Sequence, residues 1–157
     1  MKKHLGRVER LKIALGVQSA MDEGQGFETI AEYIEAGAPF HWNVNDSKLA
    51  SKTTVKTYWV WHKRFLQACP DAKLQIHHRF YDDKKKEAVF MGTMKATNTG
   101  PGGPVPEPTG KTSVTEVVLV VTFNSDQEIV CMTKIWNDAC AYRDLGWPVE
   151  GATTSEE

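Results

Sequence analysis

The spacing of apolar residues changes midway along the chain, and this change restricts the fold more than any other feature. In the first half, apolar side chains recur every three or four residues, which is the period of an amphipathic helix. From Leu74 onward they alternate with polar side chains, as in a strand covered on one face. Helices followed by a series of long strands predict an α+β fold with the helices on one face of the sheet.

Three helices are expected in the first half. Ser51 or Thr53 can cap the third helix, which carries a broad aromatic stripe, and Pro70 ends it. The expected elements are a helix over Val8–Asp22, a shorter helix over Phe27–Ile34, an extended segment over Phe40–Val44 and a helix over Val55–Leu66.

Four strands are expected in the second half, with no internal repeat and no second domain. A glycine- and proline-rich segment, Thr99–Lys111, is predicted to be a loop. We therefore expect one domain over residues 1–150 and a disordered tail over residues 151–157. The predicted strands are Leu74–Phe80, Ala88–Thr97, Thr112–Phe123 and Glu128–Asn137.

Charge and cysteine content narrow the range of partners and compartments that we expect for the chain. The formal net charge is -1, whereas binding to phosphate-rich nucleic acids or acidic membranes needs a basic excess. The short basic run Lys84–Lys86 follows two aspartates and is interpreted as a solvated turn. The three cysteines do not describe a disulfide framework, so a reducing, cytoplasmic setting is expected. Charged residues interrupt the N-terminal apolar stretch, and this favours a helix over a signal peptide.

Four stretches, which together cover most of Leu11–Trp147, resemble the SnoaL-like polyketide-cyclase family. Each motif is weak alone, and the assignment rests on their order and spacing. The stretches are the short helix and aromatic/His segment Phe27–Trp42, the helix ending Phe65–Asp71, the segment Gly92–Gly110 with Ala96-Thr97-Asn98-Thr99-Gly100 and Pro108-Thr109-Gly110-Lys111, and Lys134–Asp138 followed by Leu145-Gly146.

The resemblance implies a cone-shaped fold, in which a strongly curved, mostly antiparallel sheet and N-terminal helices enclose an apolar pocket. The same fold occurs in nuclear transport factor 2, ketosteroid isomerase and scytalone dehydratase, so fold alone does not fix function. The resemblance also implies a homodimer and chemistry without a metal or an organic cofactor. In this family a pocket carboxylate serves as acid and base during an aldol ring closure, and by motif position that carboxylate is Asp138.

Asp138 and Asn98 are the first two candidate catalytic residues. A carboxylate beside Trp136 in an apolar cup would have a raised pKa, which suits proton abstraction next to a carbonyl. The alternative for Asp138 is capping of the C-terminal helical segment. Asn98 stands where the family often carries histidine. An amide can donate a hydrogen bond to an enolate but cannot exchange protons near neutral pH, so a structural role for Asn98 stays open.

The histidines supply the remaining candidates. His77 and His78 are neighbours in a strand and point to opposite faces, and the alternation places His78 with Leu74 and Ile76 as a third catalytic candidate. His41 is a candidate at the pocket mouth. For each of them the alternative is a histidine with a purely structural hydrogen bond.

Aromatic side chains are the candidate substrate contacts, with core packing as the alternative. They are Tyr58 and Trp59 of the third helix and Trp136 of the last strand, to which His41 is added. No histidine or carboxylate spacing suggests a metal site.

Three functions are compatible with these features. The first is a cofactor-free cyclase, isomerase or dehydratase acting on a small, apolar, carbonyl-containing metabolite. The second is a non-catalytic module of the same fold that binds a ligand or a protein. The third is an epoxide hydrolase of the same fold, whose chemistry needs an Asp-Arg-Asp set. Only Arg79 and Arg64 are available for that set, and no second aspartate is convincingly placed.

Overall fold

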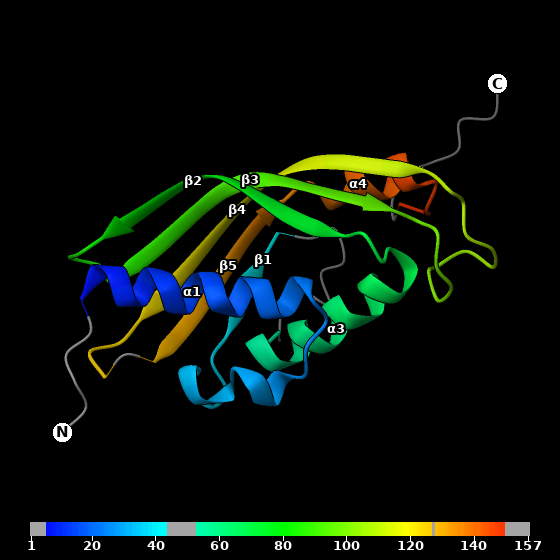
Figure 1. Ribbon diagram of the computed structural model, residues 1–157. Helices are drawn as coiled ribbons and strands as arrows, with labels where there is room; N and C mark the ends of the chain where they lie inside the picture. Colours follow the sequence, from blue (N-terminus) through cyan, green and yellow to red (C-terminus); the bar gives the residue numbers. More distant parts are fainter. Residues whose placement is uncertain (1–5, 44–52, 127, 150–157) are drawn as a thin grey trace.

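The protein is described from a computed structural model covering residues 6–43, 53–126 and 128–149. Five strands form one curved sheet in the order β1-β5-β4-β3-β2 (Figure 1). The short β1 runs parallel to β5, and the other neighbours are antiparallel. The strands are β1 (Phe40–Trp42), β2 (Lys73–Asp82), β3 (Glu87–Thr97), β4 (Thr112–Phe123) and β5 (Ile129–Trp136).

Helices α1 (Arg7–Asp22) and α3 (Val55–Ala68) lie beneath the curved sheet, and the short α4 (Asp138–Leu145) follows β5 directly (Figure 1). The predicted α+β class, with N-terminal helices against one face of a curved sheet, is therefore confirmed. Ser51, one of the expected caps of the third helix, lies outside the described residues. The expected tail, residues 151–157, lies outside them as well. The helix cap is Thr54, whose hydroxyl accepts a hydrogen bond from the Thr57 amide at 3.2 Å.

The second expected helix is wrong, because Phe27–Ile34 forms two separate 3₁₀ turns, Phe27–Thr29 and Ala31–Tyr33. Ile30 adopts φ -123° and ψ -2°, which interrupts helical geometry between the two turns. The Thr29 hydroxyl also donates to the Gly26 carbonyl at 2.7 Å. Such local side-chain bonds compete with the backbone bonds of a helix.

The buried face of α1 differs from the one that the apolar residues mark. Val8 is 56% exposed, whereas the polar Arg10 and Gln18 are buried beside Ala14 and Met21. The helix therefore turns two polar side chains inward, and one of them helps to build the site described below.

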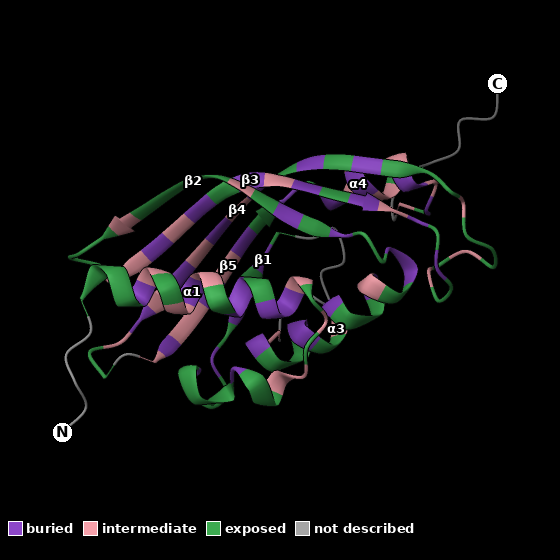
Figure 2. Cartoon of the chain, in the orientation of Figure 1, coloured by how far each residue is buried: buried purple, intermediate pink, exposed green. Residues whose placement is uncertain are grey.

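The core consists of two clusters, and Trp61 of α3 packs against both. One cluster joins α1, β1 and the first turns of α3 to the sheet, and the other joins the end of α3 to α4 and the loop before β4. Buried and exposed positions alternate along the strands, most regularly along β3 and β4 (Figure 2).

A bulge interrupts the pairing of β2 with β3. Ile76 pairs with Gly92, but the next paired residue is His78, opposite Met91, so His77 is an extra residue in β2. A Cβ atom at Gly92 would collide with the Gln75 carbonyl, which explains glycine at this close approach. Beyond the bulge, β2 presents the opposite set of side chains to the core.

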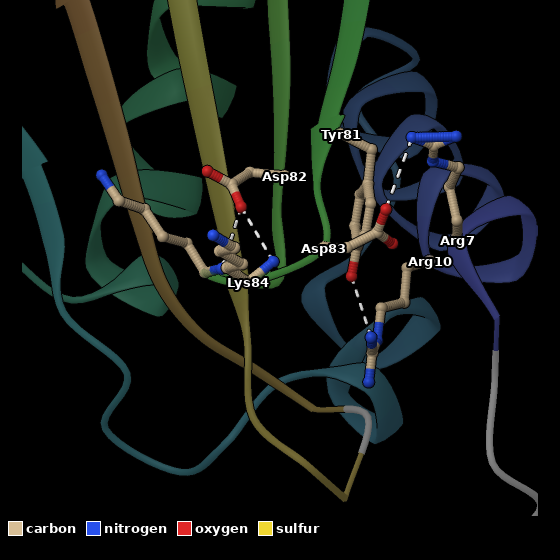
Figure 3. Close-up of polar contacts among 7 residues, drawn as sticks. Arg7, Arg10, Tyr81, Asp82, Asp83 and Lys84 are labelled. Carbon is tan, nitrogen blue, oxygen red and sulfur yellow. Dashed lines mark hydrogen bonds and ion pairs between the residues drawn. The ribbon is translucent and has the colours of Figure 1, made fainter.

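At the far end of β2, polar contacts fasten the strand to the start of α1 (Figure 3). The Arg10 guanidinium donates to the Tyr81 hydroxyl at 2.9 Å, and Arg7 lies 3.5 Å from the Asp83 carboxylate. The Asp82 carboxylate accepts from the Lys84 amide at 2.9 Å, which shapes the lysine-rich turn. No helix in the described part of the chain is both long and apolar enough to cross a membrane.

Candidate functional site

Asp138 is the first residue of α4 and is buried, with its carboxylate accepting from the Ala139 amide at 2.9 Å. Because β5 ends at Trp136, the rule of strand alternation does not extend to Asp138. The helix cap is Asn137, whose side-chain oxygen accepts from the Cys140 amide at 3.0 Å. Asp138 borders a surface hollow of about 600 Å³ at the ends of β4 and β5.

Asn98 is buried in a structural network and does not join a pocket. Its side-chain nitrogen donates to the Ala68 carbonyl at 3.0 Å. Its oxygen accepts from the Thr109 amide at 2.9 Å and from the Trp147 indole at 3.1 Å. These bonds tie the loop before β4 to the end of α3 and to the C-terminal segment. An amide engaged in this way has no free group to offer a substrate.

The expectation that His78 shares a face with Leu74 and Ile76 is wrong, because the bulge at His77 reverses the alternation. His78 pairs with Met91 and is exposed on the convex face of the sheet. His41 is also exposed, and it pairs with Thr133, next to the buried Lys134. The sheet therefore separates both histidines from the face that carries the helices, and Asp138, Asn98 and His78 do not converge.

The predicted aromatic contacts divide between two places. The Trp59 indole donates to the Gln25 carbonyl at 2.8 Å and meets the Phe27 ring edge-on, which is core packing. Tyr58 and Trp136 instead face the interior of the cup, where both contact the same buried amine.

That amine belongs to Lys134, which the sequence interpretation did not select. Lys134 lies on β5 between the buried residues Met132 and Trp136, at an inward position, and is 3% exposed. Its Nζ atom donates to the Tyr58 hydroxyl at 3.0 Å and lies 4.2 Å from the centre of the Trp136 ring. Three aromatic rings surround it, since the Trp61 centroid lies 5.8 Å away.

Burial lowers the pKa of Lys134 to about 7, although the carboxylates of Asp22 and Asp138 oppose this shift. Near neutral pH the amine is therefore present in both its neutral and its charged form. Burial, together with the charge of Asp22, raises the pKa of Tyr58 above that of a free tyrosine. The Tyr58 hydroxyl consequently keeps its proton and can donate it to a hydrogen bond.

Asp22, the last residue of α1, lies near enough for its charge to act on Lys134 and Tyr58. Its carboxylate accepts from the Gln18 side chain at 2.9 Å and faces the Leu74 amide at 3.4 Å. Burial raises the pKa of Asp22 to about 6, and these hydrogen bonds and the charge of Lys134 counteract the rise. Asp22 and Lys134 can therefore each gain or lose a proton close to neutral pH.

His62 of α3 lies beside this cluster, with Nε2 4.0 Å from the Asp22 carboxylate. Burial lowers the pKa of His62 to about 3, so the ring is neutral at neutral pH and the contact is not an ion pair. Neither ring nitrogen has a hydrogen-bond partner among the described residues. Such unsatisfied burial costs about 1–3 kcal/mol, which sets this site apart from ordinary core packing.

Two cavities lie near the amine. A small one of about 10 Å³, room for one water molecule, is lined by Lys134, Tyr58, Gln18 and the apolar interior of the cup. An open groove of about 360 Å³ lies between the second half of α3 and the Gly102–Pro104 segment. Trp61 lines this groove, and its ring centre lies 5.8 Å from the Lys134 amine, so its indole lies next to both the groove and the amine.

The signals for this cluster were present in the sequence but ran against the expected pattern. Lys134 occupies an apolar position of β5, and Gln18 and Asp22 lie along α1 beside its buried positions. Together the cluster can accept a proton, donate a hydrogen bond and hold a negative charge. No group of three or more His, Cys, Asp or Glu side chains in the described ranges is placed to hold a metal ion.

Solved structures resemble this chain over nearly its whole length. A protein from Jannaschia Sp. CCS1 that is classed as a SnoaL-like polyketide cyclase aligns with a TM-score of 0.71 and 12% identity, over 94% of this chain and 99% of the other. The chain has the SnoaL-like fold.

Two further structures with the SnoaL-like fold show the range of proteins that share it. AclR from Streptomyces galilaeus, assigned as a hydroxylase, has a TM-score of 0.70 and 16% identity over 95% of this chain and 87% of its own. IdmH from Streptomyces antibioticus, assigned as a polyketide cyclase, has a TM-score of 0.67 and 20% identity over 88% and 99%. No family model matches the sequence, and neither does any curated protein.

Proposed function

We propose that this chain is a cofactor-free enzyme that moves protons on a small, largely apolar, carbonyl-containing metabolite, as a cyclase, isomerase or dehydratase does. The observation that carries the proposal is the buried Lys134 amine. Burying a charge without full compensation costs several kcal/mol, and cores normally avoid it. Amines with perturbed protonation in the interior of a pocket-forming fold are a recognised sign of a reactive site.

The cluster supplies each role that enolisation requires. The neutral Lys134 amine would remove the proton next to the substrate carbonyl, because its pKa of about 7 matches a base that works at neutral pH. The protonated Tyr58 hydroxyl would donate to the developing enolate oxygen. Asp22 would stabilise the resulting ammonium group, which then returns its proton to the substrate.

The substrate would enter through the aromatic groove. Phe65, Trp147 and Tyr142 line this groove beside Trp61, and Arg64 lies at its rim. These surfaces suit a flat, apolar molecule with an acidic or strongly polar end. Displacement of the Trp61 indole would bring the substrate carbonyl to the amine.

Hydrogen–deuterium exchange on carbonyl compounds tests this proposal. The protein is incubated in D₂O with a panel of aryl ketones and 1,3-dicarbonyl compounds, and loss of the α-hydrogen signal is followed by NMR. We expect Lys134→Met to slow exchange by about 10²–10⁴-fold, the usual contribution of a general base. Lys95→Met, which removes an exposed lysine of β3, is the matched control and should leave the rate unchanged. Exchange at an equal rate in Lys134→Met would contradict the proposal.

A non-catalytic ligand-binding module is the second candidate, and the small size of the inner cavity favours it. Room for one water molecule beside Lys134 leaves no space for a substrate unless neighbouring side chains move. In that case the panel compounds would quench tryptophan fluorescence by binding in the groove, yet none would exchange hydrogen faster than in buffer.

A further inference from the structure

We propose that Lys134 is a covalent site, at which the Nζ atom forms an imine with the carbonyl carbon of an aldehyde or ketone. This inference rests on the proposed function, because it takes the same amine and the same substrate class. The two proposals differ in the bond that Nζ forms. In the proposed function Nζ removes a proton from the substrate, whereas here it bonds to the carbonyl carbon.

The surroundings of Nζ favour imine formation over simple ion pairing. Among the described residues, Nζ donates a hydrogen bond to the Tyr58 hydroxyl alone, at 3.0 Å, and the rings of Trp136 and Trp61 lie 4.2 and 5.8 Å away. A lysine built for charge would be expected to contact a carboxylate directly. Low local polarity instead favours the neutral, nucleophilic amine and excludes the bulk water that hydrolyses imines.

Each step balances with the groups present. The Nζ lone pair forms a bond to the carbonyl carbon, the carbonyl π pair moves to oxygen, and a proton passes from nitrogen to that oxygen through the Tyr58 hydroxyl. The carbinolamine hydroxyl then takes up a proton from the acid form of Asp22 and leaves as water, while the nitrogen lone pair forms the C=N bond of an iminium. The positive charge of the iminium makes the adjacent C–H acidic.

Asp22 is the group available to accept that C–H proton and so form the enamine. Its raised pKa of about 6 makes it a stronger base than an ordinary aspartate. Return of the proton and addition of one water molecule release the rearranged carbonyl compound and the free amine. No oxidant, reductant or further reactant is consumed.

Reductive trapping tests the covalent site. The whole protein is incubated at pH 7 with benzaldehyde and sodium cyanoborohydride, which reduces an imine to a stable secondary amine, and the benzylated lysines are located by peptide mass spectrometry. We expect Lys134 to react at least tenfold faster than Lys95. An amine with a pKa near 7 is about half neutral at this pH, whereas an ordinary lysine is almost wholly protonated.

Two variants make the result decisive. Trp61→Ala removes the indole that lies next to both the groove and the amine, and should accelerate labelling of Lys134 but not of Lys95. Trp61→Leu takes its place if circular dichroism shows that Trp61→Ala is unfolded. Lys134→Arg should abolish the fast label and leave the slow ones. Complete labelling of Lys95 with Lys134 unmodified in both wild type and the folded Trp61 variant would overturn the proposal. Labelling of both lysines at equal rates would do the same.

This experiment separates the covalent site from the function on which it rests. Hydrogen exchange that depends on Lys134, without any trapped adduct there, would overturn the imine and leave acid/base catalysis standing. A fast adduct at Lys134 in a protein that exchanges no α-hydrogen would support the covalent site and contradict the proposed function.

Discussion

Arg10 and Lys134 are both buried basic side chains that donate a hydrogen bond to a tyrosine hydroxyl, at 2.9 and 3.0 Å respectively. Arg10 reaches from the start of α1 to Tyr81 on β2, close to the exposed turn at the sheet end (Figure 3). Lys134 lies on β5 among aromatic rings, with Asp22, Asp138 and the neutral His62 nearby. The contact at Arg10 fastens a helix to a strand, whereas the one at Lys134 holds a group that can lose its proton.

The difference follows from the chemistry of the two side chains. An arginine guanidinium stays protonated and spreads its charge over a planar fork. A lysine amine loses its proton readily when it is buried. Similar hydrogen bonds can therefore hold a side chain that keeps its proton at one end of the cup and a side chain that can lose its proton inside it.

Substituting arginine for Lys134 and, separately, lysine for Arg10 should produce the largest difference in activity. Lys134→Arg keeps a positive charge but removes the proton acceptor, so we expect α-hydrogen exchange to fall about 10²-fold or more. Arg10→Lys keeps the charge at the structural contact and should retain nearly full activity. Rates measured by NMR, with circular dichroism as a check on folding, test the pair. An active Lys134→Arg variant would show that only the charge matters.

The second largest expected difference between the two sites is in how the stability of the protein depends on pH. Burial lowers the pKa of Lys134 to about 7 from 10.5, so between these values the unfolded chain binds more protons than the folded one. Stability therefore rises with pH in that interval. We expect a gain of about 2 kcal/mol between pH 7 and 9.

Urea denaturation at pH 7, 8 and 9 measures this gain. The Lys134→Met variant should lose the rise, because the titrating group is gone. His62, with its lowered pKa, and Asp22, with its raised pKa, act below pH 7 and leave this interval unaffected. A flat wild-type profile would mean that Lys134 stays protonated in the fold.

Removing the two tyrosine hydroxyls should give the smallest difference. Tyr58→Phe leaves the buried Lys134 amine without its hydrogen-bond acceptor, which we expect to cost about 2 kcal/mol. Tyr81 is only half buried, and Tyr81→Phe should cost about 1 kcal/mol or less. Urea midpoints at pH 7 compare the two variants. Equal losses would argue that the two contacts do the same structural work.

Much of the fold could be predicted from the sequence, because it depends on periodicity and end signals. The strand alternation of β3 and β4 and the buried stripe of α3 required only local patterns. The two 3₁₀ turns were missed because apolar spacing alone does not register the competing hydroxyl of Thr29. The side of the sheet on which His78 lies was predicted wrongly, because the alternation of apolar and polar residues does not reveal a one-residue bulge.

The site was less predictable, because its members come from three elements that are distant in sequence. Asp138, predicted from a motif, is buried near Lys134. Asn98, also predicted from a motif, instead forms structural hydrogen bonds that hold the loop before β4. Lys134, Asp22 and Gln18 break the expected apolar pattern at inward positions. Polar residues at such positions are worth examining before residues that lie in motifs.

The position of Trp61 between the two core clusters has a kinetic consequence. Its indole packs against both clusters and lines the groove, and its ring centre lies 5.8 Å from the amine, so a ligand that moved from the groove to Lys134 would displace part of the core. Entry would then be gated by an internal motion of the protein. The observed association rate should level off at high ligand concentration, at the frequency with which this side chain swings aside.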